Sequence, residues 1–133
     1  PKNDHCSGTL LMTPSRTTFA AGDIIELKVQ GKDLHWVNAL SFALPYNTDQ
    51  LEYVGIELLN MKDMVNLTYD RLHTNGQKEL LPTFVNRGNN FLLDEGDSDL
   101  FVLKFKAKKA GKLALKMKDG MLVDRNLGTT EVK

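Results

Sequence analysis

The sequence predicts an all-β fold, a sandwich or barrel of short antiparallel strands, and three observations support this prediction. Apolar and polar residues alternate with a period of two in several stretches, which is typical of strands with one buried face. Turn-forming residues recur between those stretches. Only residues 58–65 have helical spacing, and this segment is short enough to be a single turn or a loop.

The alternating stretches follow one another along the chain as about eight or nine short strands. The clearest lie at residues 25–29, 40–44, 101–107 and 113–117, each with an apolar residue at every second position. Turn signals occur at residues 21–23, 47–49, 75–76, 87–90, 110–111 and 119–120. Asn75-Gly76 is a strong hairpin signal, because both residues tolerate positive φ.

The length of 133 residues corresponds to one domain. Residues 1–8 carry no apolar pattern and are predicted to be a linker, so the domain is expected to cover residues 9–133. The chain begins with Pro1 rather than Met and shows no signal peptide, which indicates a module of a longer protein.

Charge and composition exclude several classes of function. Lys plus Arg and Asp plus Glu each number 17, so the net charge is zero and electrostatic binding to a nucleic acid or an anionic membrane is not expected. Apolar runs are only a few residues long, so no segment spans a bilayer. With Cys6 as the single cysteine, neither an intrachain disulfide nor a cysteine metal site is possible.

Catalytic motifs are missing from the sequence. It contains no Gly-x-Ser-x-Gly elbow, no His-Glu-x-x-His helix and no phosphate-binding glycine loop. His5, His35 and His73 are widely separated, and surface positions explain them better than a shared metal or a catalytic triad. We therefore predict that the module is not an enzyme and has no catalytic residues.

Two other features have a functional and a structural interpretation. The acidic residues of 94–99 could bind calcium, but their spacing differs from an EF-hand loop, and a solvated acidic loop is the simpler interpretation. Trp36, Tyr46 and Tyr69 could stack on sugar rings, although core or rim positions are the more ordinary explanation.

Several predicted strands lack charge on the side that should face solvent. These uncharged positions are Ala39, Ser41, Ala43, Leu81, Thr83, Val85, Leu100 and Val102. A sheet face of this composition is a candidate for protein binding. The pattern alone leaves open whether such a face binds a partner, is covered by a loop of its own chain, or is scattered apolar surface.

Three stretches of the chain resemble the cohesin modules of secreted carbohydrate-active systems in anaerobic bacteria. They are the Gly-Asp and alternating strand at 22–29, the strand and turn at 37–47 with the following 51–54, and the late strand and turn from 100 to 124. The order and spacing of these stretches, from about residue 19 to 127, carry the resemblance more than any single motif.

The resemblance implies a nine-stranded flattened β-sandwich of jelly-roll topology. It also implies a non-catalytic module that docks a dockerin module of another polypeptide. On this interpretation the module is secreted, monomeric on its own and without a cofactor, because the calcium belongs to the dockerin. The parent protein would be a glycoside hydrolase or a scaffolding protein. The alternatives are a carbohydrate-binding sandwich and a structural spacer.

In cohesins, outward residues of the third, fifth, sixth and eighth strands receive the dockerin. The matching positions are Ala39 and Ser41, then Asp70 and Leu72, then Leu81, Thr83 and Val85, and finally Leu100 and Val102. Ala39 and Ser41 depart from the family, which often has Asn and Asp there. Pro82 is a second departure, because proline is disfavoured within a paired strand, and it predicts a bulge or a one-residue shift in register.

Overall fold

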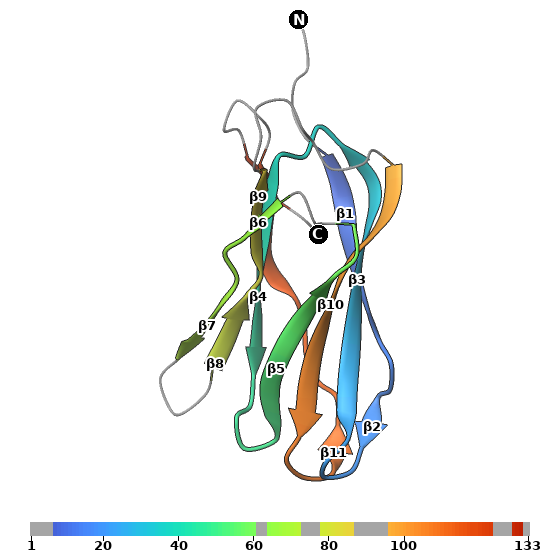
Figure 1. The fold of residues 1–133 in the computed structure, drawn as a ribbon, viewed down its shortest axis with the longest axis vertical. Coiled ribbons are helices and arrows are strands. Elements are labelled where there is room, and N and C mark those ends of the chain that lie inside the picture. The colour runs from blue at the N-terminus through green and yellow to red at the C-terminus, as the bar shows by residue number, and fades with distance from the viewer. Residues whose placement is uncertain (1–6, 61–63, 73–77, 87–95, 124–128, 132–133) are drawn as a thin grey trace, which may run out of the picture.

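The computed structural model describes residues 7–60, 64–72, 78–86, 96–123 and 129–131. In this part of the chain all regular structure is β, and two sheets pack face to face as a sandwich (Figure 1). The strands are β1 (Ser7–Pro14), β2 (Thr18–Phe19), β3 (Ile24–His35), β4 (Ala39–Tyr46), β5 (Leu51–Leu58), β6 (Met64–Asn66), β7 (Tyr69–Leu72), β8 (Lys78–Leu81), β9 (Thr83–Asn86), β10 (Gly96–Ala107), β11 (Gly111–Lys112), β12 (Lys118–Val123) and β13 (Thr129–Glu131). A search of these residues finds no helix of the length and apolar character needed to cross a membrane.

The four-stranded sheet has the order β1-β3-β10-β5, with β3 and β10 antiparallel at its centre. The period-two alternation directs every second residue into the core, as predicted. Those residues are Ile25, Leu27 and Val29 of β3 and Phe101, Leu103 and Phe105 of β10, all 0% exposed. The intervening positions point away from the core and are mostly charged.

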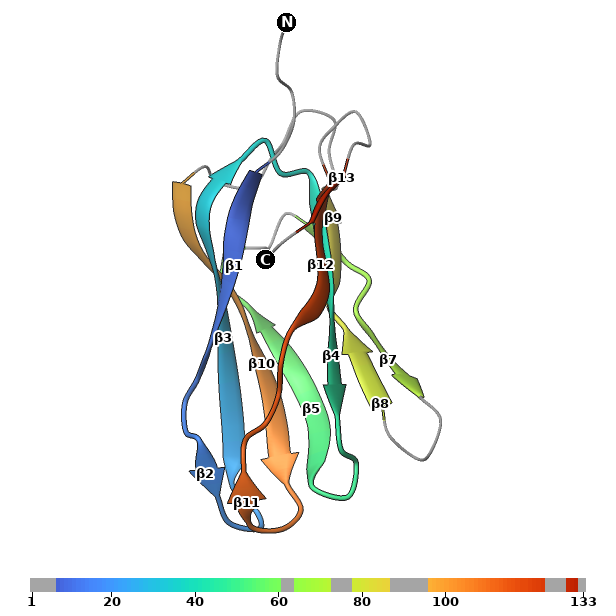
Figure 2. The same ribbon diagram turned by 180° about the vertical axis from the view of Figure 1, so that it is seen from behind.

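The seven-stranded sheet has the order β13-β12-β4-β8-β7, with β9 pairing to β4 and β6 pairing to β9 (Figure 2). A two-stranded ribbon of β2 and β11 lies at one end of the sandwich. β4 is the central strand of the larger sheet, and its neighbours on both sides are antiparallel to it.

Pro82 separates β8 from β9, which both pair with β4, without moving the register. Leu44 pairs with Leu80 on one side of the proline and Ser41 pairs with Thr83 on the other, which is one continuous register. The Phe42 N–H donates to the Pro82 carbonyl (3.2 Å), and proline has no N–H to return the bond. The bulge or register shift considered for Pro82 is therefore not present.

Aromatic side chains join the two sheets across the core. The ring of Phe101 lies 4.9 Å from Phe84 and 6.3 Å from Phe42, measured between centroids. Phe105 contacts Tyr46 at 5.1 Å in an edge-to-face arrangement. Burial of these large apolar surfaces is the main favourable contribution to the stability of the sandwich.

Several sequence expectations differ from the structure in detail. The described residues form thirteen strand segments instead of nine, because irregularities such as Pro82 divide longer strands. β1 begins at Ser7, inside the segment predicted as a linker, and residues 1–6 lie outside the described range. Asn75-Gly76 also lies outside it, although the flanking β7 and β8 pair antiparallel. Residues 119–120 form part of β12 instead of a turn.

Candidate docking face

The outward face of the seven-stranded sheet carries an uncharged surface centred on β4. Ser41 pairs with Thr83 on one side and Met121 on the other. The neighbouring core residues Leu40 and Phe84 are buried, so these three side chains point outward by alternation. We call this surface the outer apolar face and define it by Ala39, Ser41, Val65, Leu67, Tyr69, Leu81, Thr83, Val85, Met121 and Val123.

Small residues lie at the middle of the outer apolar face and larger ones at its sides. Ala39 and Ser41 on β4 are small, and Ala39 is only 9% exposed. To either side, Leu67 is 51%, Tyr69 55% and Met121 40% exposed. The other large hydrophobic residues that the described structure exposes, Leu11, Ile24 and Val54, lie on β1, β3 and β5 of the four-stranded sheet. The outer apolar face differs from that sheet because its exposed apolar residues surround small, uncharged neighbours, which makes it a candidate contact surface.

The outward face of the four-stranded sheet carries ion pairs, and it also exposes Leu11, Ile24 and Val54. The Nζ of Lys28 lies 3.2 Å from Asp99 Oδ2, and that of Lys104 lies 3.3 Å from Glu57 Oε1. A hydrogen bond from Gln30 (2.6 Å) and the charge of Lys28 lower the pKa of Asp99 below its usual range. Such exposed ion pairs are well solvated and contribute little to the free energy of binding.

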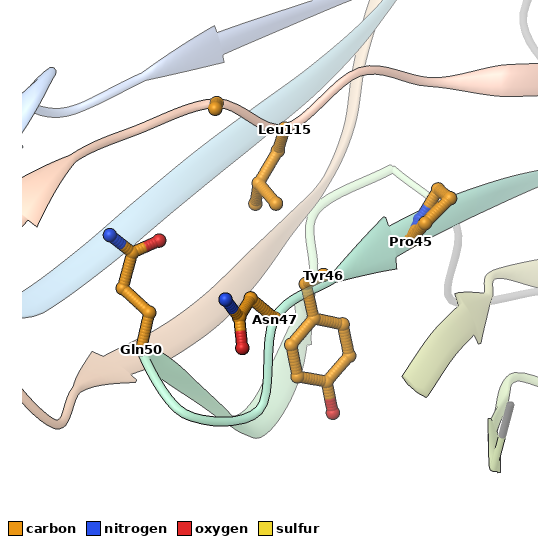
Figure 3. A pocket seen from close by; sticks show the side chains of 6 residues that line it. Pro45, Tyr46, Asn47, Gln50 and Leu115 are labelled. Atoms are coloured by element: carbon orange, nitrogen blue, oxygen red, sulfur yellow. The ribbon is translucent and has the colours of Figure 1, made fainter. Parts of the chain in front are cut away.

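A pocket adjoins the end of β4 and the chain between β11 and β12 (Figure 3). Its volume is about 280 Å³, and its lining consists of Pro45, Tyr46, Asn47, Gln50, Ala114 and Leu115. In Figure 3, Leu115 extends toward β4 from the opposite wall, and the amides of Asn47 and Gln50 lie below it. This lining offers amide hydrogen bonds and apolar contact but no pair of acid–base groups.

The structure brings five of the nine predicted contact residues together on the outer apolar face. Ala39 pairs with Val85, and Ser41 pairs with Thr83. Leu81 pairs with the exposed Tyr69 on the same outward side. The Ala39–Val85 and Ser41–Thr83 pairs lie directly beside each other across β4 and β9, so these positions can contact one ligand surface together.

Asp70 points the opposite way from the prediction. It pairs with the fully buried Leu80, and its Oδ2 accepts a hydrogen bond from the Tyr46 hydroxyl (2.6 Å) on the inner side of the sheet. The expectation that Asp70 faces the partner is therefore wrong, because the Tyr46 phenol and the ammonium of Lys78 hold its Oδ2 on the inner side. Leu72 pairs with Lys78 through its backbone, and its side chain lies outside the described part of the structure.

The two predicted contacts on β10 are also misplaced. Leu100 is 0% exposed, because the register between β10 and β3 shifts between Asp99 and Phe101 and both Leu100 and Phe101 turn inward. Val102 does point outward, but β10 belongs to the four-stranded sheet, so Val102 lies on the opposite side of the sandwich from Ser41. The strand that completes the outer apolar face is β12.

Sequence reasoning missed half of the face. The missed residues are Val65, Leu67, Tyr69, Met121 and Val123. Residues 121–123 are apolar without interruption, so alternation could not indicate which of them point outward. Val65 and Leu67 lie on and beside a strand of three residues, too short to show a period.

The residues considered for metal or sugar binding do not gather at one place. No group of three or more His, Cys, Asp or Glu side chains able to hold a metal occurs in the described ranges. His5, His73, Asp94 and Glu95 lie outside those ranges. Tyr46 is 4% exposed and Trp36 packs partly against the core, so an open platform of Trp36, Tyr46 and Tyr69 does not form.

Comparisons with known proteins identify the family and the fold. The family model described as the cohesin domain matches residues 12–133. A cohesin module from a family 33 glycoside hydrolase of Clostridium perfringens is similar in structure, with a TM-score of 0.72 and 16% identity over 97% of this chain and 92% of that one. A non-cellulosomal cohesin from the archaeon Archaeoglobus fulgidus has a TM-score of 0.64 and 15% identity, with 93% and 84% coverage.

A type I cohesin–dockerin complex from Clostridium thermocellum is a further match, with a TM-score of 0.65, 13% identity, and 99% and 92% coverage. At these identities the structural likeness shows the fold, a β-sandwich of jelly-roll type. A comparison with curated proteins gave no match. The family match covers almost the whole chain and agrees with the observed sandwich, and the chain therefore belongs to the cohesin domain family.

Proposed function

We propose that this module binds a dockerin of another polypeptide through the outer apolar face. The single observation that carries the proposal is the composition of the outer apolar face itself: the ten residues that define it carry no charge, and they expose Leu67, Tyr69 and Met121 around small side chains of β4. Solved cohesins with this fold are described in complex with dockerins, which supports the choice of partner.

The proposed module is non-catalytic and acts in a secreted protein assembly. Its polar groups at the face are the hydroxyls of Ser41, Thr83 and Tyr69, and Thr83 already donates to the Leu81 carbonyl (3.1 Å). Ion pairs therefore contribute little, and the free energy of binding comes mainly from burial of aliphatic and aromatic surface. Calcium is assigned to the dockerin, and this chain needs none.

The test is a binding screen of calcium-loaded dockerins encoded by the same genome. We expect at least one to form a stoichiometric complex that dissociates when calcium is chelated. The melting temperature of the isolated module should not change with chelator, because the calcium belongs to the partner. Failure of every dockerin to bind would refute the proposed function. A fall in the melting temperature of the module alone would refute the assignment of calcium.

A further inference from the structure

A second pocket opens between the two sheets, away from the outer apolar face. Toward the lower end of Figure 1, β7 and β8 splay away from β5. The pocket there has a volume of about 200 Å³, and its lining includes Tyr46, Tyr53, Asp70, Lys78, Glu52 and Lys108. Because Asp70 and Tyr46 face inward, this pocket is separate from the surface proposed for the dockerin.

The carboxylate of Asp70 has unused hydrogen-bonding capacity at this pocket. Its Oδ2 accepts from the Tyr46 hydroxyl (2.6 Å) and lies 3.6 Å from the Nζ of Lys78. Its Oδ1 is buried without a hydrogen-bond partner, while the side chain as a whole is 20% exposed. An unsatisfied buried oxygen is unfavourable, and a hydroxyl donor that reached it from the pocket would relieve this cost.

Aromatic rings form one wall of the same pocket. Tyr53 and Tyr46 both pack on Phe105, with centroids 5.6 and 5.1 Å away. Burial and the nearby charge of Asp70 raise the pKa of both tyrosines, so both hydroxyls stay protonated, and that of Tyr46 already donates to Asp70. Aromatic faces of this kind suit the C–H face of a ring that also carries polar groups.

The charges that line the pocket balance. Asp70 and Glu52 supply two negative charges, and Lys78 and Lys108 supply two positive ones. The Nζ of Lys108 donates to the Thr48 carbonyl (2.7 Å), which holds that ammonium at the rim. A cation would meet two lysines and an anion two carboxylates, so a neutral molecule with both donors and acceptors fits best.

We propose that this pocket binds one unit of a saccharide. A six-membered ring of benzene size fits a cavity of about 150 Å³, so about 200 Å³ accommodates one substituted sugar ring. Its hydroxyls would pair with Asp70 and Lys78, and its apolar face would lie on Tyr53. Because few groups would hold the sugar and the pocket is open to solvent, we expect a millimolar dissociation constant. This site goes beyond the dockerin proposal and does not depend on it.

The experiment is a titration of the ¹⁵N-labelled module followed by NMR. The probes are glucose, galactose and N-acetylglucosamine, with methylamine and acetate as charged comparisons. We expect at least one sugar to give saturable shifts of the backbone amides of Tyr53, Asp70 and Lys78, and neither charged probe to do so. Asp70→Asn and Tyr53→Phe should each weaken this binding severalfold. The matched control Tyr69→Phe changes an exposed tyrosine on the outer apolar face and should leave it unchanged.

Three outcomes would overturn the saccharide site. They are the absence of saturable shifts with every sugar, saturation by methylamine or acetate alone, and sugar binding that both Asp70→Asn and Tyr53→Phe leave at the wild-type level. Both substitutions are conservative, because Asp70→Asn keeps the shape of the side chain and Tyr53→Phe removes only one hydroxyl. If one variant folds poorly, the other still tests the site. None of these outcomes affects the dockerin screen, so the two proposals fail independently.

Discussion

Replacing Val85 with Asp is expected to weaken dockerin binding strongly while the module stays folded. Val85 pairs with Ala39 on one side and Val65 on the other, at the middle of the outer apolar face. Its side chain points outward, so the new carboxylate is solvated in the free module. In the complex the partner covers this position, and the carboxylate loses water without gaining a hydrogen-bond donor from this chain.

The loss of affinity in Val85→Asp depends on whether a cation of this chain lies close enough to compensate the new carboxylate. Lys118 pairs with Ala43, four residues along β4 from Ala39, which at the rise of a strand is about 13 Å. That exceeds the screening length of about 8 Å at physiological salt, so Lys118 compensates little. Burying an unpaired charge costs about 3–5 kcal/mol. At about 1.4 kcal/mol per decade, the Kd should rise by roughly two to three and a half orders of magnitude.

Val102→Asp is the matched control. It makes the same change at a partly exposed strand position, but on the charged face, where Val102 pairs with Lys28 and Glu57. Both variants should lose similar strand propensity, about 1 kcal/mol, and melt about 3–6 °C lower. Calorimetric titration with the dockerin found in the screen should show a Kd within about twofold of wild type for Val102→Asp.

Two results would contradict the proposed docking surface. If Val85→Asp binds with a Kd within about threefold of wild type, the face around β4 is not the docking surface. If Val102→Asp weakens binding as much as Val85→Asp does, while both remain folded, the partner contacts the four-stranded sheet. Circular dichroism and the melting temperature of each variant decide whether a loss of binding reflects the face or the fold.

Four further predictions concern the salt dependence of binding and the stability of the fold. The Kd for the dockerin should change by less than about threefold between ~0.05 and ~0.5 M NaCl, because the face holds few charges, and a steep salt dependence would contradict this. Tyr46→Phe should lower the free energy of unfolding by about 1–3 kcal/mol at neutral pH, since Asp70 loses its donor. Because the pKa of Tyr46 is raised in the folded state, the unfolded chain ionises first above about pH 10, and wild-type stability should fall with a slope up to about 1.4 kcal/mol per pH unit from this group. Urea unfolding from pH 9 to 11 should show a shallower fall in Tyr46→Phe, and equal slopes would disprove the assignment. Phe101→Ala should cost about 3–5 kcal/mol in the same assay, and a loss below about 1 kcal/mol would be incompatible with its contacts to Phe42 and Phe84.

The core could be predicted from the sequence because burial of one sheet face imposes a period of two. The alternation at residues 25–29 and 101–107 gave the correct inward side for every residue in both stretches. The same reasoning placed Thr83 and Val85 outward once Phe84 was taken as core, and the continuous register through Pro82 kept that assignment valid.

The wrong assignments of Leu100 and Asp70 have causes that lie outside the local sequence pattern. Leu100 is inward because one residue is inserted before Phe101, and a single insertion reverses the alternation upstream of it. Asp70 is inward because Tyr46, 24 residues away in sequence, supplies a hydroxyl donor to its carboxylate. Neither cause leaves a signature within a window of a few residues, so the sequence alone could not indicate them.

Val102 shows a different limit of prediction from sequence alternation. The same limit concerns the origin of the outer apolar face. Alternation tells which side of a strand faces out, but not which of the two outward faces that side belongs to. Both sheets cover the same core, and the four-stranded sheet shows that Lys and Glu are compatible with an outward position of this fold. Exposing Leu67, Tyr69 and Met121 on the other sheet is therefore not required for folding, and it leaves apolar surface in water. The free energy that this exposure costs the isolated module becomes available when a partner covers the face, which is the physical reason for proposing the outer apolar face as the docking surface.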